Sequence, residues 1–422
     1  MNQKNPITPE RNRNTKPRTG NAPQDRQSIY MGRVDDIPEE PQLRRRPESL
    51  AEEERRAGIA TVVFSVTVAA VALLVCLLVA VMTVRTALPS HGNGKPNGTN
   101  AGTTELTPSD PGAILFTPGA AVLPKSGANT KSISGISSKY AILIDAKTGE
   151  ILAGKDADTR FSPASMTKVM TLLVACENLK EGDLSQNVTN TEEIHNYVRA
   201  GKYRGLTVHW ADVGDGAKLL DQLYGIGVVS AADCVMMVAS YICKKATPAE
   251  NEAAFVDLMN AEVEKMGLQN THFDNPVGYD SENNYSTASD MAAIMMRALQ
   301  CELIREILST QSRRFSAFGY NKNGDFVPAY NSYFYSTLFN NVSGVGRIAA
   351  YEKKYGTFKL APLSLGGGKT GTRYSDSNYV YSLVSFAQNA DKSKTYICVT
   401  GETSGGAEVM KDAKTIYDNY IN

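Results

Sequence analysis

Histidine is scarce in this chain of 422 residues, which contains only four. His91, His195, His209 and His272 form neither a His-Glu-x-x-His motif nor a closely spaced pair, so the sequence predicts no metal-dependent hydrolase. No serine stands in a Gly-x-Ser-x-Gly motif, which argues against a catalytic triad of the α/β-hydrolase kind. We therefore expect no metal and no cofactor, and a catalytic base has to come from another residue type.

Cysteine is also sparse, and its six residues are not spaced as a disulfide framework or a zinc site. Most of them stand far apart among apolar neighbours, which predicts buried free thiols. The six are Cys76, Cys176, Cys234, Cys243, Cys301 and Cys398.

An excess of either charge is missing as well, because 44 lysines and arginines balance 44 aspartates and glutamates. Nucleic-acid-binding domains usually have a basic excess along one face or segment. The sequence therefore predicts no nucleic-acid partner.

The first 84 residues do not have the pattern of a folded soluble domain. Residues 1–56 contain 12 basic and 10 acidic residues, and such a segment buries too little apolar surface to offset the entropy of ordering. Residues 57–84 contain no charged side chain over 28 positions, more than the roughly 20 apolar residues that span a bilayer. We interpret 1–56 as a disordered tail and 57–84 as a transmembrane signal anchor.

The flanking charges predict how the anchor is oriented. Five arginines lie within residues 44–56, whereas only Arg85 and Lys95 follow the apolar segment closely. By the positive-inside rule, the N-terminus lies in the cytoplasm and the rest of the chain lies outside. A cleaved signal peptide is disfavoured, because 56 residues precede the apolar segment.

The remainder divides into a linker and a folded domain. Residues 85–134 are rich in Pro, Gly, Ser, Thr and Asn, which predicts a flexible linker. Residues 135–422 are long enough for one substantial core, and we assign them to a single catalytic domain.

Local patterns predict the class of this domain. Apolar and polar residues alternate over 140–155 around a Lys-Thr-Gly turn, which indicates a β-hairpin. Helical patterns follow at 165–179 and in 218–245, where two buried helices join near 227–230. Two strand-like runs and a terminal helix come last, so the pattern predicts an α+β domain whose sheet combines N-terminal and C-terminal strands.

The stretch FSPASMTKVMT places Ser165 three residues before Lys168 at the start of an apolar helix. Positions i and i+3 share a helix face, so the amine can reach the hydroxyl. Burial lowers the pKa of a lysine and favours its neutral form, which is the form that can act as a base. No other serine in the chain has this spacing, yet the spacing alone also fits a surface lysine beside a core helix.

Two Lys-Thr-Gly triplets have different surroundings. The first, at 147–149, is at the tip of the 140–155 hairpin and indicates a turn. The second, at 369–371, follows three glycines and precedes a strand-like run, where a ligand backbone can approach closely and a lysine can bind a carboxylate. Only the second triplet suits catalysis.

Ser230 lies between these motifs, at the expected junction of two helices and 65 residues after Ser165. Ser-x-x-Lys, a later serine and a C-terminal Lys-Thr-Gly form an ordered set with a known acyl-transfer mechanism.

Together these motifs resemble those of the low-molecular-weight penicillin-binding proteins, the serine D-alanyl-D-alanine carboxypeptidases of peptidase family S11. The resemblance covers roughly 136–421 and includes LYGIGVVSAADC and GGGKTGTRYSDSNYVYSLVSFA. It implies the β-lactamase/penicillin-binding transpeptidase-like fold, with a central antiparallel sheet, helices and an all-helical subdomain. It also implies a bacterial cell-membrane location, peptidoglycan stem peptides ending in D-Ala-D-Ala as substrates, and β-lactams as acylating inhibitors.

The resemblance further implies a role for each motif. Ser165 corresponds to the acylated nucleophile and Lys168 to its base, while Ser230 would relay a proton to the leaving group. The backbone N–H groups of Ser165 and Thr372 would form the oxyanion hole. The substrate-binding strand residues would be Lys369, Thr370, Gly371 and Thr372, with the lysine and Thr370 on the terminal carboxylate.

One position departs from the family pattern, because Ala232 replaces the asparagine of the Ser-x-Asn motif. An asparagine there could hydrogen-bond both the lysine and the substrate amide, and alanine can do neither. The resemblance favours a membrane-anchored serine D,D-carboxypeptidase that removes the terminal D-Ala of stem peptides through an acyl-enzyme on Ser165. Two alternatives stay open, a D,D-endopeptidase that cuts cross-links and a catalytically weak penicillin- or peptidoglycan-binding protein.

Overall fold

The computed structural model describes residues 112–421, with gaps at 322–323, 340–345 and 376. The tail and the transmembrane anchor expected at 1–56 and 57–84 lie outside the described residues. No helix among those that are described is both long and apolar enough to cross a membrane.

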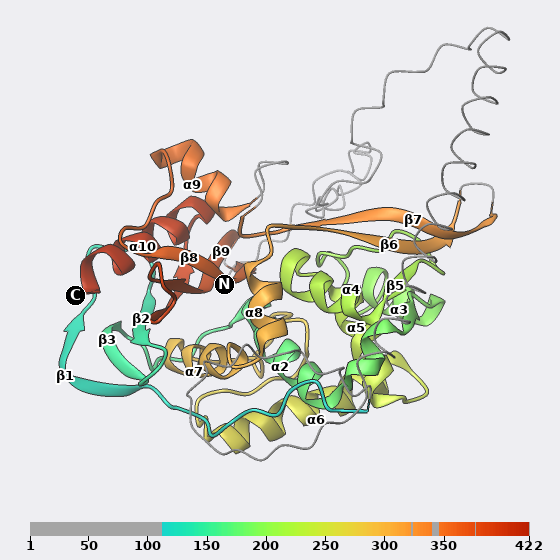
Figure 1. Cartoon of the computed structure of the whole chain (residues 1–422), viewed down its shortest axis with the longest axis horizontal. Helices are drawn as coiled ribbons and strands as arrows, with labels where there is room; N and C mark the ends of the chain where they lie inside the picture. The colour runs from blue at the N-terminus through green and yellow to red at the C-terminus, as the bar shows by residue number, and fades with distance from the viewer. Residues whose placement is uncertain (1–111, 322–323, 340–345, 376, 422) are drawn as a thin grey trace, which may run out of the picture. The chain divides into compact units, whose positions relative to one another are not determined.

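A six-stranded sheet forms the centre of the fold (Figure 1), with the strand order β1-β3-β2-β10-β9-β8. β1 is parallel to β3, and every other neighbouring pair is antiparallel. The N-terminal hairpin therefore pairs directly with C-terminal strands, as the sequence pattern predicts. The strands are β1 (Lys125–Ser132), β2 (Tyr140–Asp145), β3 (Glu150–Lys155), β8 (Ser364–Ser375), β9 (Asn378–Gln388) and β10 (Thr395–Thr403).

β1 lies inside the segment that the sequence pattern assigns to a linker. Its residues, KSGANTKS, are polar and mostly exposed, so no apolar alternation marks the strand. It joins the sheet through backbone pairing with β3. The sheet thus includes residues before 135, the expected start of the catalytic domain.

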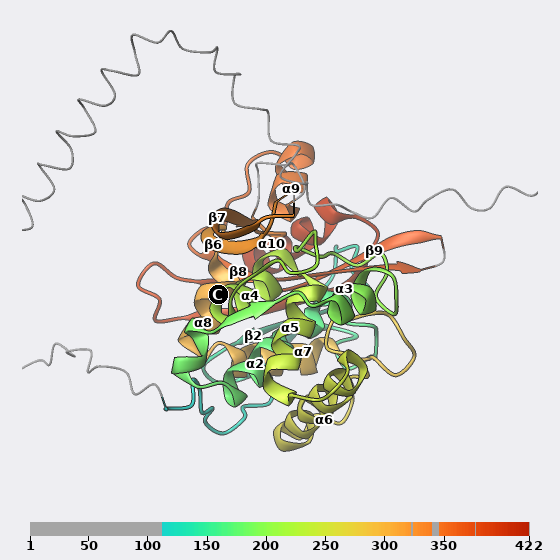
Figure 2. The same ribbon diagram turned by 90° about the vertical axis from the view of Figure 1, so that its right-hand side faces the viewer.

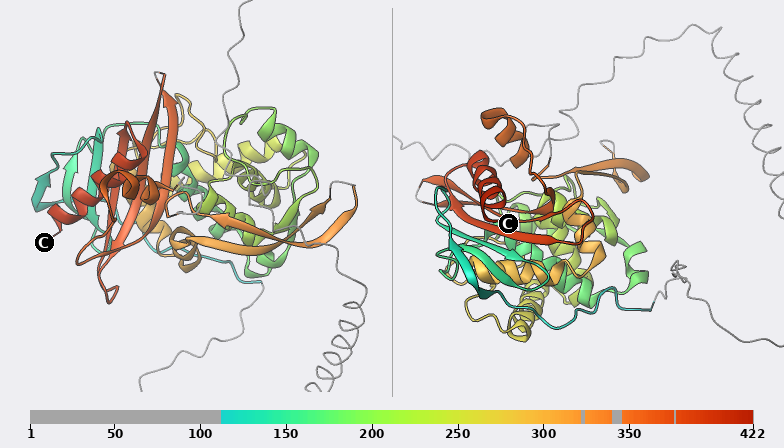
Figure 3. Two further views of the ribbon diagram at one scale, coloured as in Figure 1. Left: turned by 90° about the horizontal axis from the view of Figure 1, so that it is seen from above. Right: turned by 60° about the vertical axis from the view of Figure 1, so that its left-hand side comes forward.

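Side chains of the sheet alternate between two hydrophobic cores on its opposite faces. In β2, Ile142 and Ile144 belong to the larger core, whereas Ala141 and Leu143 belong to the smaller one. Helices α2, α7 and α8 pack into the larger core, and α9 and α10 cover the other face (Figures 1 and 3). These helices are α2 (Lys168–Asn178), α7 (Ala288–Ala298), α8 (Glu302–Ser309), α9 (Arg347–Tyr355) and α10 (Gly406–Tyr420).

The region between β3 and β8 is not all-helical, contrary to what the family resemblance implies. Four strands in the order β4-β5-β6-β7 form a second, antiparallel sheet that packs against α4 and α5 (Figure 2). β4 and β5 have three residues each, too few to give a recognisable alternation. Besides α2, α7, α8 and α9, this region contains β4 (Asn187–Thr189), α3 (Glu192–Arg199), β5 (Gly216–Lys218), α4 (Leu219–Tyr224), α5 (Ala232–Cys243), α6 (Pro248–Met266), β6 (Ser312–Tyr320) and β7 (Phe326–Tyr335).

The two buried helices predicted within 218–245 are α4 and α5. A π-helical turn, η4 (Gly225–Val229), and Ser230 join them. A Cβ atom on Gly225 would lie 2.4 Å from the sulfur of Cys234, so only glycine allows the two helices to approach this closely. The junction holds Ser230 in a fixed place at the edge of the larger core.

The cysteines of the described residues are free thiols, of which Cys243 is half-buried and the others are buried. This agrees with the prediction of buried thiols. Within 112–421, no group of three or more His, Cys, Asp or Glu side chains is placed to hold a metal ion.

Candidate active site

Ser165 lies in a 3-10 turn, η2 (Ala164–Thr167), rather than in the α-helix predicted from 165 onwards. The α-helix α2 begins at Lys168. A 3-10 turn has three residues per turn, so residues i and i+3 lie directly above one another. Ala164 has φ 47°, a left-handed conformation that costs an alanine about 1–2 kcal/mol. The strained backbone immediately before Ser165 is typical of a functional site.

Lys168 is buried at the start of α2, with 1% of its surface exposed. Its Nζ donates to Val277 O at 2.6 Å and to Ser165 Oγ at 3.3 Å. Burial lowers the pKa of Lys168 to about 7, although Asp233 and Cys234 act in the opposite direction. About half of the lysine is therefore neutral near pH 7, so it can accept a proton from the serine.

Ser230 ends the η4 turn in the left-handed conformation, with φ 70°. Its hydroxyl is buried and has no hydrogen-bond partner among the residues that the structure describes. The backbone on either side is fixed, because the N–H of Ala231 donates to Gly225 O and that of Ala232 donates to Thr207 O. A buried hydroxyl held in this way is available to a ligand.

The second Lys-Thr-Gly triplet lies on β8, the last strand in the order of the central sheet. A Cβ atom on Gly371 would lie 3.0 Å from Pro163 O, so β8 passes close to the turn that carries Ser165. Lys369 is buried and donates to Thr370 O at 3.0 Å. Burial lowers the pKa of Lys369 well below its ordinary value, and the charges of Lys168 and Arg347 lower it further.

The first triplet, at 147–149, forms the turn of the β2–β3 hairpin, as predicted. Asp145 Oδ1 accepts the N–H groups of Lys147 and Thr148 at 2.8 and 3.0 Å. Gly149 has φ 73°, a conformation that favours glycine. The contacts of this triplet are those of a structural turn.

Thr337 connects three parts of the site. Its hydroxyl lies 2.9 Å from the hydroxyl of Thr370 on β8, and its N–H donates to Val228 O in the η4 turn. Its carbonyl accepts the N–H of Arg347 at the start of α9. The serine junction, the β8 strand and α9 are therefore tied together.

Arg347 is a site residue that the sequence pattern does not reveal. Its Nη2 donates to Thr372 Oγ1 at 2.6 Å, and its guanidinium lies 4.6 Å from the ring centre of Tyr381. No motif surrounds it. The signal that could have found it is its position in the first turn of a helix, where the helix dipole disfavours a cation.

The predicted residues Ser165, Lys168 and Lys369 thus lie around one site, with Arg347 added from α9. A buried lysine beside a serine, on a sheet covered by helices on both faces, defines the class of serine hydrolases that has the penicillin-binding fold. The model of peptidase S11, described as D-alanyl-D-alanine carboxypeptidase, matches residues 127–338. The chain belongs to this family. The match ends before β8, so the placement of the second triplet rests on the contacts described above.

Two curated relatives are similar to slightly less than half of the chain. D-alanyl-D-alanine carboxypeptidase DacF of Bacillus subtilis (strain 168) is 30% identical over 199 residues, which are 47% of this chain and 48% of that protein. D-alanyl-D-alanine carboxypeptidase DacA of Escherichia coli (strain K12) is 32% identical over 195 residues, which are 45% of this chain and 46% of that protein. The chain thus spans about half the length of the curated relatives it matches.

Solved structures share the fold. The crystal structure of the Streptomyces K15 DD-transpeptidase has a TM-score of 0.55 and 26% sequence identity, and the match covers 68% of this chain and 97% of that chain. Penicillin binding protein 5 from Haemophilus influenzae has a TM-score of 0.52 at 24% identity, over 67% of this chain and 70% of that chain.

The buried lysine predicts a pH-dependent stability difference for Lys168→Met. Lowering the lysine pKa from 10.5 to about 7 disfavours the protonated folded state by about 5 kcal/mol. The variant avoids this penalty but leaves the Val277 carbonyl unpaired, which costs about 1–3 kcal/mol. We expect Lys168→Met to be more stable than the wild type by about 2 kcal/mol at pH 6 in denaturant unfolding.

The sign of the pH dependence is fixed by proton binding. Between pH 7 and 10.5 the unfolded lysine keeps its proton and the folded one does not, so wild-type stability rises with pH. From pH 6 to pH 9.5 this gain is about 3 kcal/mol, so the advantage of Lys168→Met should disappear or reverse at pH 9.5. An equal advantage at both pH values would contradict the lowered pKa.

Proposed function

We propose that the protein is a serine D,D-carboxypeptidase that removes the terminal D-Ala from peptidoglycan stem peptides through an acyl-enzyme on Ser165. The observation that carries this proposal is the buried Lys168, whose pKa is about 7 and whose Nζ lies 3.3 Å from Ser165 Oγ. An ordinary lysine has a pKa of about 10.4 and stays protonated at neutral pH. The family membership and the names of the two curated relatives support the substrate class.

We assign acylation to three side chains. Neutral Lys168 takes the proton of Ser165 as Oγ bonds to the carbonyl carbon of the penultimate D-Ala. The carbon–nitrogen bond then breaks, and the departing D-Ala amine receives the proton from Lys168 through Ser230, whose hydroxyl has no partner in the described structure. The oxyanion is assigned to the N–H groups of Ser165 and Thr372.

Deacylation uses the same base in the same way. Lys168, neutral again, accepts a proton from a water molecule whose oxygen attacks the ester carbon. The ester bond breaks, the shortened peptide leaves as a carboxylic acid, and the proton on Lys168 returns to the oxygen of Ser165. The cycle needs no metal and no cofactor in this mechanism.

Substrate binding is assigned to β8, because an edge strand offers backbone groups to an extended peptide. The part of β8 assigned to the substrate consists of Lys369, Thr370, Gly371 and Thr372. The terminal carboxylate would bind near Lys369 and Thr370, with Arg347 joining them through its hydrogen bond to Thr372. Burial lowers the pKa of both Lys369 and Arg347, but an arginine starts from a much higher pKa and stays protonated at neutral pH, so Arg347 supplies the dependable cation.

The location of the domain is also a proposal. The apolar segment 57–84 and the arginines before it favour a single-pass bacterial membrane protein with the catalytic domain outside the cell membrane. Peptidoglycan stem peptides and β-lactams would meet the domain there.

The nucleophile assignment is tested with a labelled penicillin. Ser165→Ala should lose covalent labelling completely, because no acyl-enzyme forms without Oγ. Ser162→Ala, three residues earlier in the same segment, is the matched control and should be labelled like the wild type. Labelling of Ser165→Ala would place the nucleophile elsewhere.

Release of D-Ala from a pentapeptide separates the open functions. Wild-type protein should release D-Ala at a measurable rate. Cleavage of cross-linked dimers without D-Ala release would instead identify a D,D-endopeptidase. Penicillin labelling with neither reaction would identify a binding protein, a possibility that Ala232 keeps open.

The two Lys-Thr-Gly triplets make a matched pair of variants. Lys369→Ala should lower kcat/KM for D-Ala release by about 100-fold, or about 2.7 kcal/mol, because it removes a substrate-binding group. Lys147→Ala should keep wild-type activity, because Asp145 holds that turn through backbone N–H groups. Equal losses in two folded variants would show that the triplets are wrongly separated.

Ala232→Asn tests the departure from the family motif. Ala232 is fully buried, and extra atoms in a packed site typically cost about 1–3 kcal/mol. Since Val277 O already accepts from Lys168, we expect the added amide to crowd the lysine and to lower the acylation rate about 10-fold, or about 1.4 kcal/mol. Faster acylation by penicillin would show that the amide fits and improves the site.

A further inference from the structure

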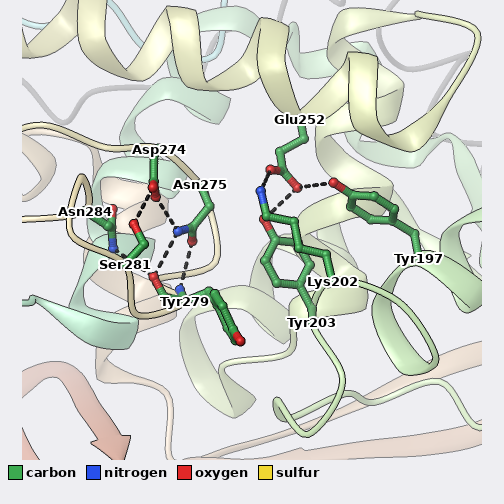
Figure 4. Close-up of polar contacts among 9 residues, drawn as sticks. All are labelled: Tyr197, Lys202, Tyr203, Glu252, Asp274, Asn275, Tyr279, Ser281 and Asn284. Carbon is green, nitrogen blue, oxygen red and sulfur yellow. Dashed lines mark hydrogen bonds and ion pairs between the residues drawn. The ribbon is translucent and has the colours of Figure 1, made fainter. Parts of the chain in front are cut away.

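Residues 275–279, between α6 and α7, form a tight turn that we name the acceptor turn (Figure 4). Asn275 is almost completely buried and closes this turn with its own side chain. Its Nδ2 donates to Tyr279 O at 2.9 Å, and its Oδ1 accepts the N–H of Tyr279 at 2.8 Å. Nδ2 also donates to Asp274 Oδ1 at 2.7 Å. The amide therefore fixes both ends of the turn relative to each other.

The acceptor turn directs two carbonyl groups at α2. Val277 O accepts from Lys168 Nζ at 2.6 Å, and Pro276 O accepts from Thr171 Oγ1 at 2.6 Å. Lys168 and Thr171 are both buried and lie three positions apart on the helix. The turn is thus bonded to the helix that carries the base.

The same turn packs closely against the backbone of Ala164 and Ser165. Gly278 has φ 72°, and a Cβ atom there would lie 2.0 Å from Ala164 O and 2.9 Å from the nitrogen of Ser165. No larger residue fits without displacing the serine. The position of the acceptor turn therefore sets the position of both Ser165 and its base.

Neighbouring groups support the far end of the turn (Figure 4). The ring of Tyr279 lies edge-on to Tyr203, with the ring centres 5.8 Å apart. Tyr203 donates from its hydroxyl to the buried Glu252, which also pairs with Lys202. Tyr203 thus supports the ring of Tyr279, while Asn275 holds the backbone of the turn whose Val277 carbonyl contacts Lys168.

The alanine at position 232 makes this arrangement important for the reaction. Alanine offers no side-chain acceptor to Lys168, so Val277 O supplies a hydrogen-bond acceptor for the buried amine. A neutral amine that donates one N–H to a fixed carbonyl has its lone pair held in a defined direction. Without that carbonyl, the amine could rotate away from Ser165.

We propose that Asn275 is a positioning residue for the base, because its amide holds the Val277 carbonyl on Lys168 and so directs the lysine toward Ser165. This inference rests on the proposed serine acyl-transfer function. It predicts that loss of the Asn275 amide impairs acylation even though Asn275 does not contact the reacting atoms.

The test is the pH dependence of acylation by a labelled penicillin in Asn275→Ala. In the wild type, the rate should rise with pH through about 7 as Lys168 becomes neutral. A carbonyl acceptor stabilises an ammonium more than an amine, so its loss lowers the lysine pKa. In the plot of acylation rate against pH, we expect the rising part (the limb) to move to lower pH. We expect the constant rate at higher pH (the plateau) to fall at least about 10-fold.

The other ionisable groups that act with Lys168 remain unchanged in this variant. They are Asp233 and Cys234 on α5 and Lys369 on β8. A shift of the rising limb to lower pH therefore indicates that the Val277 carbonyl no longer accepts from Lys168. A limb and plateau equal to those of the wild type, or a limb at higher pH, would overturn the proposal.

Asn260→Ala is the matched control. Asn260 makes the same pair of bonds to the backbone of Phe273, with Nδ2 to Phe273 O at 2.8 Å and the N–H of Phe273 to Oδ1 at 3.0 Å. Both variants should unfold at lower denaturant concentration, but only Asn275→Ala should alter the pH profile. An equal change in both would show that the loop acts only through its overall stability, and the proposal would be wrong.

A second variant keeps the size of the side chain, in case Asn275→Ala does not fold. Asn275→Asp keeps the acceptor for the Tyr279 N–H, but it loses the donors to Tyr279 O and Asp274 Oδ1 and places a carboxyl group beside Asp274. Its plateau should therefore lie below the wild type. A wild-type plateau would overturn the proposal. Since only penicillin acylation is measured, a protein that is labelled but releases no D-Ala would refute the carboxypeptidase function and still test Asn275.

Discussion

The structure depends on one constraint, which is that Lys168 must be buried and its amine must still have hydrogen-bond partners. Burial disfavours the protonated form of Lys168 by about 5 kcal/mol. This cost is comparable to the free energy of unfolding of many whole domains, about 5–15 kcal/mol. The rest of the fold has to supply that difference. Two hydrophobic cores, one on each face of the central sheet, do so, and the larger core surrounds α2 itself.

A second buried amine makes the constraint more severe. Lys369 lies close enough for Lys168 to lower its pKa, and Arg347 adds a third cation. Asp233 is a buried carboxylate that acts on Lys168, and it is itself held by the N–H groups of His209 and Trp210. Burial and crowding therefore favour the neutral form of both amines. A carboxylate bound beside them would favour the protonated form of Lys369, so the charge of this lysine is coupled to the binding of an anionic group.

How much the sequence reveals depends on whether contacts are local. The Ser165–Lys168 spacing, the hairpin turn at 147–149 and the helix junction at Ser230 follow from short-range periodicity and turn chemistry, and the structure has each of these elements. Arg347 reaches the site from α9, and no spacing rule links it to residue 372. The contact of the Asn275 turn with α2 is likewise non-local, because Lys168 is more than 100 residues earlier in the chain than Val277. The sequence pattern does not predict β1, because backbone pairing with β3 holds this polar strand in place and no apolar alternation marks it.

The order of strands in the central sheet has a consequence for how the domain folds. β2 lies between β3 and β10, and Ala141 pairs with Thr400 near the other end of the domain. Until β9 and β10 are available, one edge of β2 is unpaired and the apolar side chains of Ile142 and Ile144 lack part of their core. Sheets closed by such distant pairings fold slowly, because the entropy of closing a long loop comes before the gain from contact. Ser165 and Lys168 precede β8 by about 200 residues, so they reach this strand only when the sheet closes.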